Sequence, residues 1–240
     1  MPRGKGVGVT SLCVITARGG SKRIPRKNIR GFCGRPIIAY SIGAALGSGL
    51  FDEVMVSTDD EEIAGVARRY GAKVPFMRGP ATSGDLATTR DVLVEVLGAY
   101  RARGREFDEL CCLYPTAPFV TAAKLREAHA MLPGADTVLA VVRFSFPPQR
   151  GLVEGGGSLA WWMPECAGAR SQDLPPVLHD AGQFYFCRPG RLLAGGALLG
   201  PVTRGCEVPE TEAQDIDNES DWRIAEMKYE RMVADGQAQG

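Results

Sequence analysis

The chain has 240 residues, of which 45% are hydrophobic and 23% charged, a composition typical of a globular protein with ample core material. Its 28 Lys and Arg residues balance its 28 Asp and Glu residues, and this zero net charge argues against a general nucleic-acid-binding protein, which would carry a basic excess. No apolar run approaches the roughly 20 residues of a membrane-spanning helix, so neither nucleic acid nor membrane is an expected partner.

Apolar periodicity predicts that strands and helices alternate over residues 1–142. Strands are expected at roughly 8–16, 54–56, 73–77, 109–114 and 137–142. The helices between them are expected to begin at Pro36, at Asp59 with Glu62 completing a capping box, near Val92 and at Thr121, the first two ending at Gly49 and Gly71. This order predicts an α/β fold with a mainly parallel sheet and helices on both faces.

The regular alternation breaks at 144–164, a segment that contains Pro147-Pro148, a glycine-rich turn and Trp161-Trp162. We expect an extended arm or hairpin there, and exposed aromatic arms often dock onto a partner subunit. An equally weighted alternative is that the tryptophans cover the edge of the core. Strands are expected to resume at 183–188 and 201–208, followed by a helix from Ser220 to about Val233. Because no linker is evident, the chain is expected to be one domain, 1–240, with the arm inserted.

The cysteines do not form a recognisable metal or disulfide pattern. Seven of them, at 13, 33, 111, 112, 166, 187 and 206, are scattered and show no C-x-x-C spacing. We interpret them as reduced, buried residues of a cytoplasmic protein. The apolar run near the N-terminus contains Gly, Thr and Ser, so we interpret it as a strand and not as a signal peptide.

The segment Ala17–Asn28 reads ARGGSKRIPRKN and follows the first expected strand. Gly19 and Gly20 are expected to let the backbone turn tightly and bring N–H groups to a ligand. Since α/β sheets bind ligands where a strand passes into a helix, the segment predicts a site for several negative charges, with a triphosphate as the main candidate. The alternative is a solvated basic loop, and neither the Walker A nor the G-x-G-x-x-G pattern is present. No Asp or Glu occurs in residues 1–51 to neutralise its five cations, Arg18, Lys22, Arg23, Arg26 and Lys27.

A second signal is the acidic segment Asp215-Ile216-Asp217. In an extended segment residues i and i+2 point the same way, so both carboxylates can face one ligand while Ile216 packs inward. Paired carboxylates suit Mg²⁺ that is shared with substrate phosphates. The alternative is that Asp217 or Asn218 only caps the last helix, and the triphosphate-type loop elsewhere in the chain favours the metal.

Separated motifs along the chain resemble one enzyme family. In order they read ARGGSKRIPRKN, VSTDD, YPTAPF, RSQDL, HDAGQFY and DIDxxxD. Together they resemble the CTP-dependent cytidylyltransferases of nine-carbon keto-acid sugars, the acylneuraminate cytidylyltransferases or CMP-sialic acid synthetases, over roughly 11–232. The HDAGQFY stretch and Tyr114, where sialic-acid members usually have Gln, resemble the pseudaminic acid branch most closely.

The resemblance implies a Rossmann-like, nucleotide-diphospho-sugar transferase fold. It implies a homodimer in which an arm of one subunit reaches the sugar site of the other. The implied reaction is Mg²⁺-dependent transfer of CMP from CTP to the anomeric hydroxyl of a nonulosonic acid, pseudaminic acid foremost, with release of pyrophosphate. A cytoplasmic enzyme that serves the decoration of flagellin or surface glycans is implied as well.

Matching motif to motif assigns roles to residues of this chain. Asp215 and Asp217 would bind Mg²⁺. The nucleotide would be held by Ala17, Arg18, Gly19, Gly20, Ser21, Lys22, Lys27, Asn28, Arg78, Ala87 and Thr89, of which Arg18, Lys22 and Lys27 would be catalytic. The sugar would be held by Tyr114, Arg170, Gln172, His179, Gln183 and Tyr185, with Arg170 for the carboxylate because Arg can pair a carboxylate through two hydrogen bonds. Arg78-Gly79-Pro80 departs from the usual Arg-Pro, and Thr89 stands where a serine is usual.

Other readings of the same residues remain open. The nearest is the same reaction on N-acetylneuraminic or legionaminic acid. A GT-A-like glycosyltransferase would need a D-x-D at a strand end, whereas the D-x-D here lies near the C-terminus. A non-catalytic nucleotide-binding module is the third.

Overall fold

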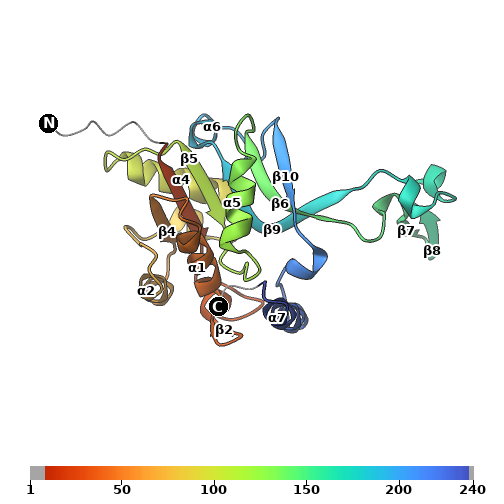
Figure 1. Cartoon of the computed structure of the whole chain (residues 1–240), viewed down its shortest axis with the longest axis horizontal. Coiled ribbons are helices and arrows are strands. Elements are labelled where there is room, and N and C mark those ends of the chain that lie inside the picture. The colour runs from red at the N-terminus through yellow and green to blue at the C-terminus, as the bar shows by residue number, and fades with distance from the viewer. Residues whose placement is uncertain (1–8, 238–240) are drawn as a thin grey trace.

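The computed structural model describes residues 9–237 of the chain. A six-stranded sheet of order β10-β6-β9-β5-β1-β4 lies at its centre (Figure 1). Neighbouring strands are parallel except at β9, which is antiparallel to both β5 and β6. The predicted mainly parallel sheet is therefore confirmed. Its strands are β1 (Ser11–Thr16), β4 (Glu53–Ser57), β5 (Glu109–Leu113), β6 (Thr137–Arg143), β9 (Leu178–Cys187) and β10 (Thr203–Glu207).

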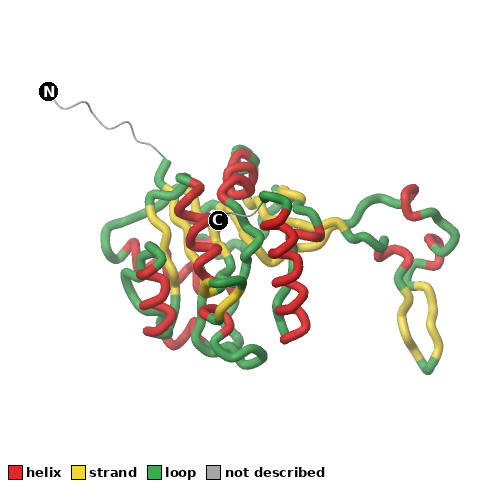
Figure 2. Tube along the Cα trace, turned by 60° about the horizontal axis from the view of Figure 1, so that its bottom comes forward, coloured by secondary structure: helices red, strands yellow, loops and turns green. Residues whose placement is uncertain are grey.

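Helices cover both faces of this sheet, as the alternation predicts (Figures 1 and 2). Successive strand residues point to opposite faces, so Cys13 and Ile15 of β1 join one apolar layer while Leu12 and Val14 join the other. The layer of Cys13 and Ile15, the first layer, contains α1 (Ile38–Ser48), α2 (Glu61–Arg69) and α5 (Ala122–Ala130), and the second contains α4 (Thr89–Arg101) and α6 (Pro189–Leu193).

Within residues 9–237 no helix is both long and apolar enough to cross a membrane.

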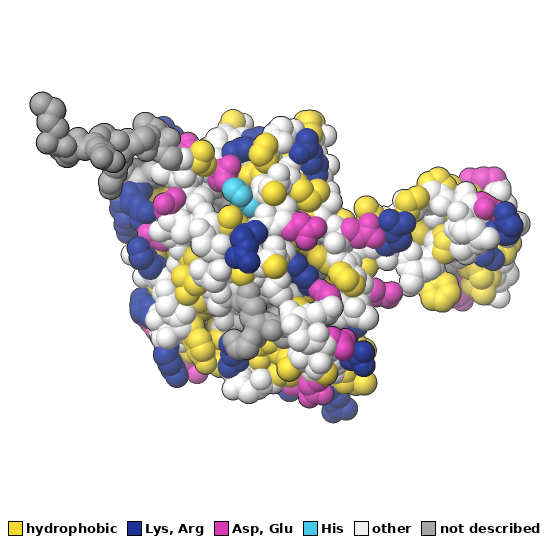
Figure 3. Space-filling model, viewed as in Figure 1, with side chains coloured by type: hydrophobic (Ala, Val, Ile, Leu, Met, Phe, Trp, Pro, Cys, Tyr) yellow, Lys and Arg dark blue, Asp and Glu magenta, His cyan; other side chains and the backbone are white. Residues whose placement is uncertain are grey.

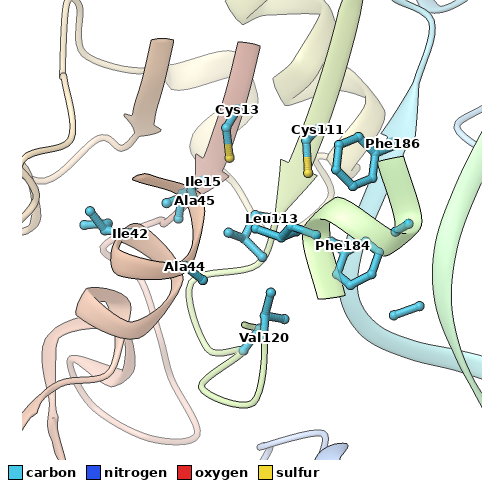
Figure 4. Close-up of a cluster of buried hydrophobic side chains, with 14 of the residues drawn as sticks. Cys13, Ile15, Ile42, Ala44, Ala45, Cys111, Leu113, Val120, Phe184 and Phe186 are labelled. Atoms are coloured by element: carbon cyan, nitrogen blue, oxygen red, sulfur yellow. The ribbon is translucent and has the colours of Figure 1, made fainter. Parts of the chain in front are cut away.

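Figure 4 shows the first layer, where Cys13 lies beside Cys111, its partner in the neighbouring strand β5. All seven cysteines are free thiols, as predicted. Burial raises the pKa of the Cys111 thiol well above its ordinary value, which keeps it protonated and unreactive. The prediction that every cysteine is buried is wrong at two positions, because Cys33 lies exposed in a hairpin turn and Cys166 lies half-buried away from the sheet.

A third apolar cluster attaches the C-terminal helix α7 (Glu219–Ala234) to the body. Trp222 of α7 packs edge-to-face on Phe32, with ring centroids 5.5 Å apart. Phe32 belongs to the small hairpin of β2 (Gly31–Phe32) and β3 (Arg35–Pro36). Ile24 of the basic loop and Ile216 of the acidic segment are buried in the same cluster. One cluster therefore brings together two segments that are remote in the sequence.

The start of α2 differs from the prediction. Asp60, not Asp59, caps this helix by accepting the N–H groups of Glu62 at 2.9 Å and Ile63 at 3.0 Å. Asp59 is occupied elsewhere, since it accepts the N–H of Gly19 at 2.8 Å. The cap position was missed because either aspartate fits the local pattern and only the contact with the loop distinguishes them.

Of the other predicted helix ends, two are confirmed and two are wrong. Thr121 caps α5 by accepting the N–H of Lys124, and Gly49 ends α1 with a φ of 67°, both as predicted. Pro36 does not begin α1, because it pairs with Gly31 in the β2–β3 hairpin. Nor does Ser220 cap α7, since Asn218 accepts the Ser220 and Asp221 N–H groups while Asp221 completes a capping box.

The strand expected at 73–77 forms only one bridge, between Lys73 and Met55 of β4. Pro75 has no N–H to continue such a ladder, so the chain leaves the sheet edge and enters the short helix α3 (Pro80–Ser83). The expected first residue of the first strand, 8, lies outside the described residues.

Residues 144–177 leave the body between β6 and β9 and form a protruding arm, longer than the predicted 144–164 (Figures 1 and 2). The Phe144 N–H donates to the Val177 carbonyl at 3.0 Å and closes the base of this arm. Trp161 and Trp162 are 39% and 61% exposed, so they do not cover the edge of the core. The arm carries a hairpin of β7 (Leu152–Gly155) and β8 (Ser158–Trp161).

Glu53, at the start of β4, is a buried carboxylate held by three donors. Tyr100, Arg105 and Lys73 donate to it, Lys73 at 3.0 Å. Burial acts to raise the Glu53 pKa, but the hydrogen bonds from Tyr100, Arg105 and Lys73 outweigh it and hold the pKa below the ordinary value. Because the native pKa is lower than the unfolded one, this group stabilises the fold above pH 4.5, and the contribution is lost as the pH falls through the native value.

We predict that Glu53→Gln lowers the free energy of unfolding by about 2–4 kcal/mol at pH 7, because it removes the charged acceptor of the buried Tyr100 hydroxyl and the buried partner of Arg105 and Lys73. The difference from wild type should shrink as the pH falls below 4.5. Urea unfolding at several pH values measures this. Glu61→Gln, which alters an exposed carboxylate of α2, is the matched control. A difference that does not vary with pH would contradict the prediction.

Candidate active site

The strand order reverses at β1, which has β4 on one side and β5 on the other. In open α/β sheets ligands bind at such a reversal, beyond the carboxyl ends of the strands. A pocket of about 470 Å³ opens there, lined by the basic loop 17–28, the segment 78–89 and residues 114–116. Its volume is ordinary for a small-molecule site. We call it the first pocket.

The basic loop is held by contacts with the body. Ile24 is fully buried in the cluster under α7. The side-chain amide of Asn28 donates to the carbonyl of Arg18 at 2.9 Å and ties the two ends of the loop together. These contacts place the loop's charged side chains around the first pocket.

The two glycines of the loop play different parts from those predicted. Neither Gly19 nor Gly20 has a positive φ, so neither is required for a tight turn. A Cβ at Gly19 would lie 2.9 Å from the Oδ2 atom of Asp60, so close approach to α2 explains this glycine. Gly20 has open space around it, and nothing in the structure requires glycine there.

The cations of the loop divide into two groups. Arg26 lies outside the first pocket, with a left-handed φ of 57° and its guanidinium bound to Asp60 and Glu62 of α2. It therefore anchors the loop. The cations that line the pocket are Arg18, Lys22, Arg23 and Lys27.

Acidic residues remote in the sequence pair with these cations. Asp85 binds Arg18 at 2.6 Å and Lys22 at 2.5 Å. Arg23 binds Asp217 at 2.7 Å. The absence of acids from residues 1–51 therefore did not mean that the cations lack partners. Pairs as exposed as these contribute little stability, so an anionic ligand can replace the carboxylates.

The acidic segment meets the loop through Lys27. The Lys27 ammonium donates to the carbonyl of Ile216 at 2.6 Å, and Ile216 packs inward as predicted. Burial lowers the Lys27 pKa, although the charges of Asp217 and Asp215 oppose this shift. Both carboxylates therefore lie near the same ammonium.

The donor set of the acidic segment fits Mg²⁺. Residues 9–237 contain no group of three or more His, Cys, Asp or Glu side chains that would enclose a metal ion. Mg²⁺ needs no such group, because it commonly takes one or two carboxylates and completes its shell with water and substrate phosphates. Asp215 and Asp217 can serve in this way, since Asn218 and not Asp217 accepts the N–H groups that begin α7.

A second pocket of about 540 Å³ lies beside the first. It is lined by residues 179–182 of β9, by residues 210 and 213–216 and by Lys228 of α7. Tyr114 and Thr116 line both pockets. The Tyr114 hydroxyl lies 3.0 Å from Thr89 Oγ1 in the first pocket. The two pockets are therefore neighbours that share a wall.

Tyr114 also packs on Tyr185, with ring centroids 5.5 Å apart. The Tyr185 hydroxyl donates to Asp180 Oδ2 at 2.5 Å, and Asp180 lines the second pocket. Burial and this hydrogen bond raise the Tyr185 pKa well above its ordinary value, so the hydroxyl stays a donor. The polar wall therefore continues from the first pocket to the second.

Most of the residues predicted to hold the nucleotide surround the first pocket. Three do not line it: Ala17 is buried in the core, the Gly19 N–H donates to Asp59, and a Cβ at Gly20 would meet only open space. Arg78 reaches the pocket wall but also binds Ser57, whose carbonyl accepts from its guanidinium at 2.6 Å. The predicted residues that line the pocket are Arg18, Ser21, Lys22, Lys27, Asn28, Arg78, Ala87 and Thr89.

The residues predicted to hold the sugar are not all brought together. Tyr114 and His179 line the second pocket, and Tyr185 lies behind Tyr114. Gln183 is buried beneath and donates to the carbonyl of Glu212 at 2.6 Å. Arg170 and Gln172 lie on the arm, outside both pockets, and Arg170 there binds Asp173 at 2.7 Å.

Sequence reasoning missed Asp85, Asp180 and Lys228. Asp180 could have been found, since it lies inside the HDAGQFY motif. Asp85 lies in a segment of small polar residues with no local signal, and Lys228 looks like one more charge on a helix. Only the tertiary contacts of Asp85 with the basic loop and of Lys228 with residues 210 and 213 reveal these two.

Comparison with solved structures finds the same fold in a protein of known structure. A CMP:2-keto-3-deoxy-manno-octonic acid synthetase, solved in complex with CTP, superposes with a TM-score of 0.67 at 19% identity, covering 92% of this chain and 99% of that one. At this identity the likeness establishes a shared fold. It confirms the fold class expected from the sequence.

Sequence comparisons show the family. A model described as "Cytidylyltransferase" matches residues 12–142. A pseudaminic acid cytidylyltransferase of Campylobacter jejuni is 39% identical over 222 residues, which cover 91% of this chain and 96% of that protein. N-acylneuraminate cytidylyltransferase A of Danio rerio is 37% identical over 91% of this chain and 50% of that protein. The chain belongs to the cytidylyltransferase family, as its motifs predict.

We predict that Asp85→Asn strengthens the binding of CTP by about twofold to tenfold, because the carboxylate that competes with phosphate for Arg18 and Lys22 is removed. Titration calorimetry with CTP measures this. Asp136→Asn changes a carboxylate remote from the first pocket and is the control. Weaker binding by Asp85→Asn would show that Asp85 organises the loop and does not compete for it.

Proposed function

We propose that this protein transfers CMP from CTP to the anomeric hydroxyl of pseudaminic acid, giving CMP-pseudaminate and pyrophosphate. The observation that carries the proposal is the pair of adjoining pockets that share Tyr114, one lined by cations and the other by mixed polar groups. A triphosphate suits the first and a polyhydroxylated acid suits the second. The 39% identity to a pseudaminic acid cytidylyltransferase over most of both chains supports this choice of sugar.

The first pocket supplies charge and position. Lys22 and Arg18 extend from the loop and take the phosphates in place of Asp85, while Lys27 remains fixed by Ile216. As the sugar oxygen bonds to the α-phosphorus, the bond to the β-phosphate breaks and charge builds on the leaving pyrophosphate. Cations fixed in advance stabilise that charge, and such positioning accounts for most catalysis of phosphoryl-type transfer.

Asp215 and Asp217 are the residues that would hold Mg²⁺. When bound, the ion supplies positive charge that offsets the charge of the phosphates. Lys27 keeps the two carboxylates next to the loop, through its bond to the carbonyl between them. The carboxylates face a region already crowded with cations, which offsets their repulsion of the triphosphate.

A second candidate is the same reaction on N-acetylneuraminic acid. The 37% identity to a vertebrate N-acylneuraminate cytidylyltransferase favours it. Tyr114 and the HDAGQFY stretch argue for pseudaminic acid, because both lie at the second pocket, where the sugar would be distinguished. We place the reaction in the cytoplasm, where CTP is available.

We predict that the purified protein, with CTP and Mg²⁺, releases pyrophosphate when given pseudaminic acid and releases at least about tenfold less with N-acetylneuraminic or legionaminic acid. A coupled pyrophosphate assay measures this. Equal or greater release with N-acetylneuraminic acid would overturn the choice of sugar. Tight CTP binding without release for any nonulosonic acid would favour a non-catalytic module.

Variants of the basic loop and of the acidic segment test the site assignment in that assay. Lys22→Ala and Asp217→Asn should fold normally, because Lys22 is largely exposed and Asp217 is partly exposed, and should lose most turnover. Arg68→Ala and Asp235→Asn remove exposed charges outside both pockets and should leave turnover unchanged. Rates like wild type in Lys22→Ala or Asp217→Asn would overturn the site assignment.

We also propose that the arm docks onto a second copy of the chain. Hydrophobic side chains gather on the distal part of the arm, far from the body (Figure 3). A homodimer would cover them and would explain why Arg170 and Gln172 lie outside their own chain's pockets. The exposed large apolar residues of the arm are Phe144, Phe146, Leu152, Val153, Leu159, Trp161 and Trp162.

We predict that the wild-type protein sediments as a dimer and that the double variant Leu159→Ser/Trp162→Ser sediments as a monomer, since both side chains are exposed apolar groups of the arm. Deletion of 144–164 should have the same effect. Met227→Ser removes an equally exposed apolar group from α7 and is the control. A dimer that persists without the arm hairpin would contradict the proposal.

A further inference from the structure

The second pocket contains a cation that lacks a carboxylate partner. Lys228 of α7 lines this pocket together with Asp215. Its ammonium donates to the carbonyls of Glu210 at 3.0 Å and Ala213 at 2.7 Å. Within residues 9–237 it forms no ion pair, although three carboxylates line the same pocket.

Lys124 is a lysine of the same region that does have a carboxylate partner. Lys124 donates to the carbonyl of Phe119 at 3.0 Å and forms an ion pair with Glu212. Glu212 belongs to the same short turn, 210–212, that supplies a carbonyl to Lys228. The Glu212 carboxylate is thus used by Lys124, whereas the Glu210 carboxylate lines the second pocket without pairing with Lys228.

The hydrogen bonds of Lys228 leave room for a ligand. An ammonium has three donors, and the two carbonyls take two of them. Burial lowers the Lys228 pKa, and the charge of Glu210 opposes this only in part. An anion bound in the pocket would offset the cost of keeping a half-buried charge.

The position of Lys228 relative to the two pockets indicates which anion it binds. Tyr114 lines both pockets, and the cations of the basic loop line only the first, so phosphates held by these cations would lie across Tyr114 from Lys228. Lys228 and Asp215 line the same pocket, and Asp215 is one residue from the carbonyl that fixes Lys27. A negative group held by Lys228 therefore lies next to the place where the two substrates meet.

We propose that Lys228 binds the carboxylate of the acceptor sugar acid and is a specificity-determining residue of the second pocket, an inference that rests on the proposed function. In a nonulosonic acid the carboxylate is attached to the anomeric carbon. An ammonium that holds it also positions the anomeric hydroxyl toward the nucleotide. Neutral sugars lack this group and are disfavoured, because they would leave a half-buried charge without an anionic partner.

This assignment differs from the one carried over by motif. Arg170 was assigned to the sugar carboxylate, but in this chain it lies on the arm and binds both oxygens of Asp173, at 2.7 and 3.2 Å. Lys228 lies in the pocket of its own chain without any contribution from a second copy. A variant that cannot dimerise should therefore keep the contact between Lys228 and the sugar carboxylate, whereas it would lose a contact made by Arg170 of a second copy.

The first test compares Michaelis constants. Lys228→Gln keeps an N–H donor for the carbonyls of Glu210 and Ala213 but removes the charge. We expect its KM for pseudaminic acid to rise about tenfold to hundredfold, while its KM for CTP changes by less than about twofold. Lys228→Arg should recover most of the affinity. Arg231→Gln removes a charge from the exposed side of the same helix and is the control, and melting temperatures check the fold.

The second test does not depend on turnover. Titration calorimetry compares pseudaminic acid with its C1 amide, which lacks the negative charge. Lys228→Gln should weaken binding of the acid and leave binding of the amide unchanged. Equal weakening for both ligands would mean that Lys228 only supports the 210–213 turn, and no weakening for either would assign the carboxylate to another group; both results overturn the inference.

The same titration separates the inference from the proposed function. A wild-type protein that binds the acid through Lys228 but releases no pyrophosphate would overturn the proposed reaction and keep the role of Lys228. Pyrophosphate release with the same KM for the acid in wild type and Lys228→Gln would overturn the role of Lys228 and keep the proposed reaction. Absence of any binding of the acid by wild type would overturn the inference outright.

Discussion

The candidate site depends on the contact between Lys27 and the carbonyl of Ile216, which joins segments 189 residues apart. Ile24 and Ile216 are buried under Trp222 in one apolar cluster, so burial of hydrophobic surface holds the basic loop against the acidic segment. Like charges crowd the loop and would otherwise drive it open. The apolar cluster offsets that repulsion and holds the backbone of the loop beside the first pocket.

Charged side chains of the loop fall into those that build it and those left for a ligand. Arg26 is bound by two carboxylates of α2 and has a strained backbone, which is typical of a structural anchor. Arg18 and Lys22 share one exposed carboxylate, Asp85, and such pairs exchange readily for phosphate. The same distinction separates Lys124, which is neutralised within the turn, from Lys228, which faces the second pocket.

The arm shows how the sheet itself shapes the site. β9 runs antiparallel between β5 and β6, so the chain must leave the sheet after β6 and return from the opposite direction. The register between β6 and β9 shifts between Leu139 and Val141, beside the residues of β9 that line the second pocket. A long excursion therefore starts and ends next to the proposed sugar site, and the proposed dimer uses that excursion to reach a second copy.

The sequence by itself determined the alternation of strands and helices, the basic loop and the acidic segment, because each depends on periodicity or on residues adjacent in the chain. The motifs also identified the family. Only the tertiary structure decided that Asp60 and not Asp59 caps α2, that Arg26 is an anchor, that Asp85 pairs with Arg18 and Lys22 and that Arg170 lies outside the pockets of its own chain. These outcomes depend on which distant side chains come within hydrogen-bonding distance, and that is settled by packing across the sheet, which no local pattern records.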